Sequence, residues 1–238
     1  MAIGYGINLS ADGSSPERAA PSARAIQRNT GGVPSGVYWI VNPAVNSGNP
    51  IQVYCDMETD GGGWMLIMQN SSIAGTELGS TNYSLFNQTS PPNASSRANV
   101  TTSYSILGWA DGLKNPNRPF EYMIEGVERR SWGGIWRAND SSYSFVDTSN
   151  AKTNITLLET FGTWTYNDSG IEARMPWRSG SGSGFLTTSV SPTSSWWGTL
   201  IEGTVPGGYG PAPYMASAVS GTTDTQSPGV IWYWMRNI

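Results

Sequence analysis

Hydrophobic and polar positions alternate most clearly between residues 35 and 69, where the pattern predicts three β-strands. Val37–Val41 is a run of β-branched and aromatic residues, and Ile51–Met57 alternates apolar with polar side chains. Trp64–Met68 is apolar on both faces, which is typical of a central strand covered on both sides. Asp60 and Gly61 form a strong turn signal between the last two strands. The pattern therefore predicts a β-meander as the nucleus of the fold.

The remainder of the chain predicts short elements separated by long polar loops. A cap and proline pattern indicates a short helix starting at Ser15, and a second helix is expected over Ser22–Asn29, ended by Gly31. A third helix is expected over Tyr104–Leu113, and Ser131–Trp136 is expected to be a turn with aromatic walls. Further strands are expected over Phe120–Val127, Ser142–Val146, Asn154–Leu158 and the closing segment Gly229–Arg236.

Length and composition favour one large domain with a short N-terminal arm, divided as residues 1–33 and 34–238. Charged residues make up 13% of the 238 residues, about half the usual share of ~25%. Eleven Trp and eleven Tyr residues supply a large apolar content, which excludes a disordered chain. These properties indicate a loop-rich β protein with an aromatic core.

Charge and hydropathy exclude two classes of partner. The net charge is −4 and the thirteen Lys and Arg residues are scattered, so we expect no nucleic-acid partner. No apolar run approaches ~18 residues, so no membrane insertion is expected. The N-terminus lacks a basic segment followed by an apolar run, so we expect no secretory signal.

The residue types needed for common catalytic sites are missing. The chain has no histidine, which removes Ser-His-Asp and Cys-His sites and most zinc sites. Cys55 is the only cysteine, and without a histidine base we interpret it as a buried small hydrophobe rather than a nucleophile. We therefore expect no enzymatic activity.

Two groups of acids are candidates for chemistry. Asp56, Glu58 and Asp60 could supply oxygens to calcium, but the turn signal at the same place favours a structural role. A second group, consisting of Glu121, Glu125 and Glu128, could supply the opposed carboxylates of a glycosidase, and an exposed acidic strand edge explains it equally well.

The order G-V-Y-W-I, then V-Y-C-D-M-E-T-D-G-G-G-W, resembles the opening of the fibrinogen-like domain found in fibrinogen chains, ficolins, tachylectins and intelectins. The resemblance implies an α+β fold with a twisted, mainly antiparallel sheet, few short helices and long loops. It is carried by Gly36, Tyr38, Cys55, Asp56, Gly61, Gly62, Gly63 and Trp64.

Two expectations come from comparing this chain with the family's pattern. Animal members use the cysteine of this motif in a disulfide bond, but residues 1–54 contain no second cysteine, which fits folding in a reducing cytoplasm. The family's calcium site comes from a later Asp-x-Asp pair, of which Asp224 is the nearest fragment here. Calcium is therefore unsupported, and we expect no cofactor.

A second resemblance precedes the first. The segment M-A-I-G-Y-G-I-N-L, leading through D-G-S-S into the G-V-Y-W-I motif, is similar to the start of virion structural proteins of tailed phages, particularly phages of marine cyanobacteria. It implies a virion protein made in the host cytoplasm and displayed on the capsid, neck or tail, with copies of itself and other virion proteins as partners. Alternation of apolar residues in the arm predicts a strand that contacts another subunit, through Met1, Ile3, Tyr5, Ile7 and Leu9.

The fibrinogen-like resemblance also implies an alternative function, a sugar-binding lectin that could depend on calcium. Aromatic side chains in loops could form a sugar platform, and a virion protein that binds host-surface glycans would combine both functions. Packing in the core or between subunits is the interpretation that we favour for these side chains. The platform candidates are Trp196, Trp197, Tyr209 and Tyr214, with Trp132 and Trp136 as a further pair.

Overall fold

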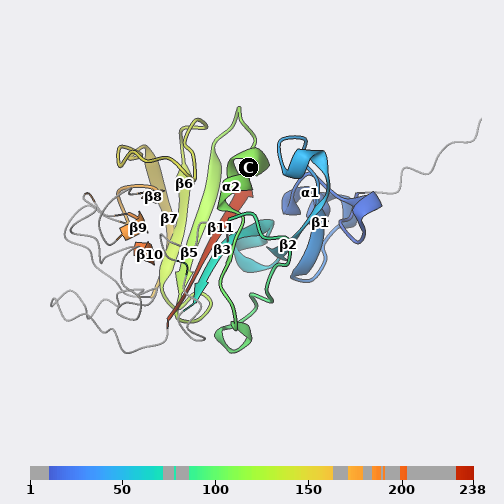
Figure 1. Ribbon diagram of the computed structural model, residues 1–238, viewed down its shortest axis with the longest axis horizontal. Coiled ribbons are helices and arrows are strands. Elements are labelled where there is room, and N and C mark those ends of the chain that lie inside the picture. The colour runs from blue at the N-terminus through green and yellow to red at the C-terminus, as the bar shows by residue number, and fades with distance from the viewer. Residues whose placement is uncertain are drawn as a thin grey trace, which may run out of the picture.

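The computed structural model describes residues 11–71, 78, 86–162, 171–178, 184–188, 190, 199–202 and 229–238 (Figure 1). These residues form a large sheet with the strand order β1-β2-β3-β11-β5-β6-β7, to which β4 adds beside β3, and a small sheet with the order β10-β9-β8. All pairings between these strands are antiparallel. The expected α+β class with a mainly antiparallel sheet is confirmed.

The described strands are β1 (Gly36–Ile40), β2 (Ile51–Asp56), β3 (Trp64–Ser71), β4 (Tyr104–Ser105), β5 (Phe120–Gly126), β6 (Gly133–Ala138), β7 (Ile155–Phe161), β8 (Trp177–Arg178), β9 (Gly184–Thr187), β10 (Thr199–Glu202) and β11 (Val230–Asn237). The α-helices of the described part are α1 (Ala23–Thr30) and α2 (Leu107–Leu113), and single 3-10 turns lie at Pro16–Arg18, Asn46–Gly48, Thr59–Gly61 and Arg97–Asn99. None of the described helices is long and apolar enough to cross a membrane.

The predicted three-strand nucleus is confirmed as β1, β2 and β3. Gly36 lies opposite Cys55 in the β1–β2 pair, and Asp56 lies opposite Trp64 in the β2–β3 pair. Every residue of β3 is buried, as expected for a strand that is apolar on both faces. The strand lies between β2 and β11, so both of its edges are also paired.

The closing strand β11 is inserted between β3 and β5 in the middle of the large sheet (Figure 1). Trp232 lies opposite Gln69 of β3, and the indole nitrogen of Trp232 donates a hydrogen bond to the Gln69 side-chain oxygen at 2.8 Å. The predicted strand over Gly229–Arg236 is thus confirmed, with bounds one residue later. Strand β3, from the first third of the chain, and strand β5, from its middle, therefore both depend on the last strand for their pairing.

The segment before β1 packs on its own domain from residue 11 onward. Ser22 caps α1 by accepting a hydrogen bond from the Ala25 backbone nitrogen at 3.2 Å, and Gly31 ends the helix with φ of 76°. Ile26 is fully buried in the common core. A parallel bridge joins Ala20 to Ile40 of β1. Met1–Ser10 lie outside the described residues, so the assembly role of the arm stays a prediction.

Two sequence predictions in the middle of the chain are wrong. The expected turn over Ser131–Trp136 is largely strand β6, because Gly133 and Gly134 allow the chain to pass close to neighbouring backbone before the strand continues. A Cβ on Gly133 would lie 2.0 Å from the Ile124 carbonyl oxygen.

The expected strand over Ser142–Val146 consists of turns and irregular chain. Its backbone nitrogens bond to side-chain acceptors instead of a neighbouring strand: Ser142 donates to the Asp140 carboxylate at 2.8 Å, and Phe145 to the Asp111 carboxylate at 2.9 Å. The helix expected over Tyr104–Leu113 begins later, at Leu107, because the first two residues pair with β3 as β4.

We predict that Gly62 and Gly61 differ sharply in their tolerance of alanine. Both have positive φ, 71° and 75°, but a Cβ on Gly62 would lie 2.1 Å from the Met57 carbonyl oxygen, whereas a Cβ on Gly61 meets nothing within 4 Å. Gly61→Ala should lower the free energy of unfolding by about 1 kcal/mol, from backbone strain alone. Gly62→Ala should lower it by about 3 kcal/mol or more, since the backbone must move. Urea unfolding of both variants checks this, and equal losses would contradict it.

Candidate functional site

The acidic end of β2 organises the turn that follows it. The Asp56 carboxylate accepts hydrogen bonds from the backbone nitrogens of Glu58 at 2.8 Å and Thr59 at 2.9 Å. The indole nitrogen of Trp64 donates to the Thr59 carbonyl oxygen at 2.9 Å and holds the far side of the same turn. The turn interpretation of this acidic segment therefore accounts for the geometry. No cluster of His, Cys, Asp or Glu with metal-binding spacing occurs in the part of the chain that the structure describes.

A partly buried arginine joins Asp56 to β5. Arg129 forms an ion pair with Asp56, and its Nε lies 2.7 Å from a Glu125 carboxylate oxygen. Its guanidinium also lies 4.6 Å from the centre of the Trp234 ring. Both acids are buried, with side-chain exposures of 3% for Asp56 and 0% for Glu125. The group ties β2, β5 and β11 together on one face of the sheet.

The pKa values of these two acids shift in opposite directions. Burial alone would raise the pKa of Asp56, but the Arg129 charge and the hydrogen bonds from Thr59 and Glu58 together lower it. Burial raises the pKa of Glu125, and Arg129 offsets this only in part. Asp56 is therefore held as a carboxylate more firmly than Glu125.

A second arginine connects the last strand to the same turn. Arg236 donates to the carbonyl oxygens of Asp60 and Gly62 at 2.6 and 3.0 Å, and its Nη2 lies 2.8 Å from the Asp60 carboxylate. Its Nε donates to the Glu121 carboxylate at 2.9 Å. The guanidinium lies 4.1 Å from the centre of the Trp64 ring. The planar guanidinium of Arg236 has several donors, and through them it connects the turn after β2 to β5 and β11.

The exposed-edge interpretation of the second acidic group is wrong for Glu121 and Glu125, which are buried. Both carboxylates are used in ion pairs that hold the sheet, so the pair does not form the opposed carboxylates of a glycosidase. Only Glu128 of this group is exposed. The sequence pattern does not reveal the arginine partners, because they are far away along the chain. Arg129 lies 73 residues from Asp56, and Arg236 lies 115 residues from Glu121.

The other motif residues have structural positions. The Tyr38 hydroxyl donates to the Pro34 carbonyl oxygen at 2.7 Å. Cys55 is fully buried, and burial raises the pKa of its thiol, so the buried-hydrophobe prediction is confirmed. Gly63, with φ of 80°, brings the chain against α1, where a Cβ would lie 3.0 Å from side-chain atoms of Arg24 and Gln27.

The predicted arm and sugar platform lie outside the described residues, and both stay predictions. These are Met1, Ile3, Tyr5, Ile7 and Leu9 for the arm and Trp196, Trp197, Tyr209 and Tyr214 for the platform. The further aromatic pair is described, and both members are buried, Trp132 with 4% and Trp136 with 0% exposure. Trp136 stacks on Tyr122 with ring centres 5.5 Å apart. The core interpretation is therefore confirmed for this pair.

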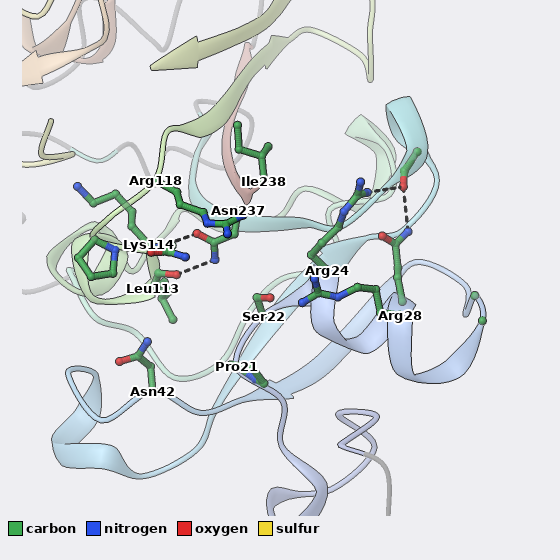
Figure 2. Close-up of a pocket in the computed structure, with 16 residues that line it drawn as sticks. Pro21, Ser22, Arg24, Arg28, Asn42, Leu113, Lys114, Arg118, Asn237 and Ile238 are labelled. Atoms are coloured by element: carbon green, nitrogen blue, oxygen red, sulfur yellow. Dashed lines mark hydrogen bonds between the residues drawn. The ribbon is translucent and has the colours of Figure 1, made fainter. Parts of the chain in front are cut away.

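A pocket of about 1090 Å³ lies between α1 and the segment that follows α2, and sequence reasoning did not find it (Figure 2). Figure 2 shows Arg24 and Arg28 on one side of it and Arg118 and Asn237 on the other. Asn237 fixes the second wall, because its side chain accepts from the Asn115 backbone nitrogen at 2.8 Å and donates to a carbonyl oxygen of α2 at 2.9 Å. Among the described residues, the lining contains Arg24, Arg28, Lys114 and Arg118 and no Asp or Glu.

Comparison with known proteins supports the motif assignment. A family model for the C-terminal globular domain of fibrinogen beta and gamma chains matches residues 24–85, a stretch that begins within α1 and includes β1 to β3. This match supports the fibrinogen-like resemblance over residues 24–85, the stretch that contains the motif. A comparison with curated proteins gave no match.

The solved structures to which this chain is similar include two fibrinogen-like globe domains and a fibrin D-dimer. The fibrinogen-like globe domains of human ANGPTL6 and human ANGPTL2 are each 12% identical with a TM-score of 0.43, over 91% of this chain and 95% and 98% of theirs. The lamprey fibrin D-dimer, solved with the peptide ligand Gly-His-Arg-Pro-amide, is 13% identical with a TM-score of 0.47, over 92% of this chain and 76% of its own.

We predict that Arg129→Met lowers the free energy of unfolding by about 3–5 kcal/mol, because it leaves two carboxylates buried without their cation. The neighbouring Arg130→Met is the matched control. Arg130 pairs with Glu159 at the surface, with side-chain exposures of 46% and 39%, so its loss should cost at most about 1 kcal/mol. Urea unfolding at pH 7 measures both, and a small loss for Arg129→Met would contradict the structural role of the buried group.

Lys152 is a buried cation outside these clusters. Its side chain is 2% exposed, its ammonium donates to the Ser144 carbonyl oxygen, and it lies 3.8 Å from the Asp147 carboxylate. Burial lowers its pKa to about 8, which Asp147 and Asp111 offset only in part. The folded protein therefore loses this proton at a lower pH than the unfolded chain.

We predict that the stability of the parent protein rises relative to that of Lys152→Met as the pH increases from about 8 to 10. Between the folded pKa of about 8 and the ordinary value of 10.5, the unfolded chain binds the proton that the folded protein has lost, so this residue's contribution to the unfolding free energy increases with pH. Chemical unfolding of both proteins between pH 7 and 10 measures the difference. Parallel pH profiles would contradict the shifted pKa.

Proposed function

We propose that this protein is a structural protein of a tailed-phage particle, displayed on the capsid, neck or tail, and that it associates with copies of itself and with other virion proteins. The observation that carries the proposal is the order of the chain. An arm similar to those of cyanophage virion proteins leads directly into the fibrinogen-like motif. The family match at residues 24–85 supports the second half of that arrangement.

Residues 11–41 are held on their own domain by hydrogen bonds, which supports a contact role for the first residues of the arm. Trp39 of β1 donates a backbone hydrogen bond to Gly13 at 2.8 Å, and Ala20 donates to Trp39 at 3.1 Å. The Asn29 side chain donates to the Ala11 carbonyl oxygen at 2.8 Å. The later part of the arm, from residue 11, is therefore fixed on its own domain. We propose that the residues before it start from this fixed point and contact a neighbouring subunit.

We place the acceptor for the arm at the outer edge of β7. Strand addition requires an open sheet edge. The β1 edge is occupied by its own N-terminal segment, whereas β7 pairs with β6 alone among the described strands. Leu157 and Leu158 of β7 are exposed, at 38% and 42%. An exposed edge with apolar side chains favours association unless a neighbour covers it. Met1–Leu9 of a second copy has the alternation needed to cover it.

The lectin alternative stays a prediction. Its sugar platform and the Asp224 fragment lie outside the described residues, and no specific observation in the described part favours a calcium-dependent site. The buried carboxylates of the sheet are already used in ion pairs. These features support an interpretation of the described part as a scaffold.

We expect the odd-numbered arm residues to control oligomerisation. Ile3→Ser combined with Ile7→Ser should leave the melting temperature within about 2 °C and yield monomers, because both side chains would leave their pockets on the neighbour. Ala2→Ser combined with Asn8→Ser alters the even positions and should behave like the parent. Leu158→Lys on β7 should also yield monomers. Light scattering after size-exclusion chromatography measures the mass of each species.

Two results would contradict the proposal. Unchanged assembly of the Ile3→Ser and Ile7→Ser variant would exclude the arm as the contact. Absence of the protein from a mass-spectrometric inventory of purified phage particles would exclude the virion role itself. Retention on particles by a variant that is monomeric in solution would retain the virion role and place the arm's partner on the particle.

A further inference from the structure

The thirteen cationic side chains of this chain divide into three groups with different surroundings. Seven form ion pairs with carboxylates: Arg18, Lys114, Arg129, Arg130, Arg137, Lys152 and Arg236. Three more, Arg97, Arg174 and Arg178, have other partners. The remaining arginines are Arg24, Arg28 and Arg118. Within the described residues these three form no ion pair, and all three line the pocket of Figure 2.

None of the described carboxylates forms an ion pair with these three guanidinium groups. Arg24 makes one long hydrogen bond, 3.3 Å to the Gly61 carbonyl oxygen, and Arg28 and Arg118 are exposed. Like charges that share a concave surface repel one another, and an anionic ligand would relieve that repulsion. The chain as a whole carries a net charge of −4, so the pocket is a local exception to the charge of the molecule.

Lys114 does not add to this charge, although it lines the pocket. Its ammonium lies 3.3 Å from the Asp111 carboxylate and 5.0 Å from the centre of the Phe120 ring. It is therefore neutralised inside the domain. The ligand-binding charge comes from the three guanidinium groups, whose flat fork of donors matches carboxylate and sulfate groups.

The remaining lining favours a polar ligand. Asn42 uses its side-chain oxygen to accept from the Ala44 backbone nitrogen at 2.9 Å, and its amide nitrogen has no bonding partner among the described residues. The side-chain oxygen of Asn115 likewise accepts a hydrogen bond from the Asn117 backbone nitrogen at 3.0 Å. Such amide donors bind hydroxyl groups. None of the described residues that line the pocket is aromatic, so the recognition proposed here relies on charge and hydrogen bonds rather than on stacking.

We propose that this pocket binds an acidic polysaccharide through carboxylate or sulfate groups on its sugar rings. A volume of about 1090 Å³ exceeds the need of a single oxyanion and accommodates a short stretch of rings. An acidic peptide fits less well, because the apolar lining is limited to Pro21, Leu113, Pro116 and Ile238, and Leu113 is buried. The inference is separate from the virion role, since it concerns a site on the domain itself and needs neither the arm nor calcium.

The test compares four probes on the full chain by isothermal titration calorimetry. A heparin hexasaccharide carries sulfate and carboxylate groups, an oligogalacturonate of the same length carries carboxylates alone, maltohexaose is neutral, and poly-L-glutamate is an acidic peptide. We expect binding to at least one of the two acidic sugars, with affinity that falls as the salt concentration rises, and no binding to maltohexaose. The acidic sugar that binds identifies the oxyanion.

Charge-matched variants locate the site. Arg28→Gln and Arg118→Gln should each weaken binding by about three- to tenfold, as expected for loss of one charged hydrogen-bonding group. Arg130→Gln removes the same charge outside the pocket and should leave the affinity unchanged. Equal affinities for all three variants, binding to neither acidic sugar, or tighter binding to poly-L-glutamate than to both sugars would overturn the proposal.

Discussion

The fold depends on the return of the last strand to the middle of the sheet. β11 pairs with β3 along one edge and with β5 along the other, so among the described strands the backbone pairing that connects the two halves of the large sheet runs through residues 230–237. Residues from Val230 to Met235 are fully or almost fully buried. Without β11, the facing edges of β3 and β5 would lack backbone hydrogen-bond partners in the interior of the sheet, and unpaired buried backbone groups cost free energy. The earlier strands are therefore stable only in the presence of the last one.

Buried charge fixes the register of that inserted strand. Trp232, Trp234 and Arg236 lie on one face of β11, and Arg236 lies directly opposite Glu121 of β5. A slip of one residue would move the guanidinium to the apolar face and leave Glu121 buried without its cation. Arg129 acts in the same way between Asp56 and Glu125. A chain with few charges thus uses several of them in the interior, where each one specifies a single pairing.

The use of most cations in ion pairs also explains why the surface pocket is positively charged. Most cations already have partners, and Arg24, Arg28 and Arg118 form no ion pair with any described carboxylate, so these three arginines stand out against an acidic molecule. Arg24 and Arg28 project from α1, whose opposite face is packed in the core through Ala23 and Ile26. The pocket is consequently built on the fixed part of the domain, which reduces the entropy that a ligand would have to remove on binding.

Local patterns determined the strands of the meander, the capped helix α1 and the glycine turn, because alternation, capping and positive φ act over a few residues. The sequence also placed Cys55 in the core. Tertiary structure alone decided that Ser142–Val146 is not a strand and that Glu121 and Glu125 are buried, since their partners come from distant segments. It also brought Arg118 to Arg24 and Arg28. Separations of about ninety residues leave no local pattern, so only the packed sheet could create that pocket.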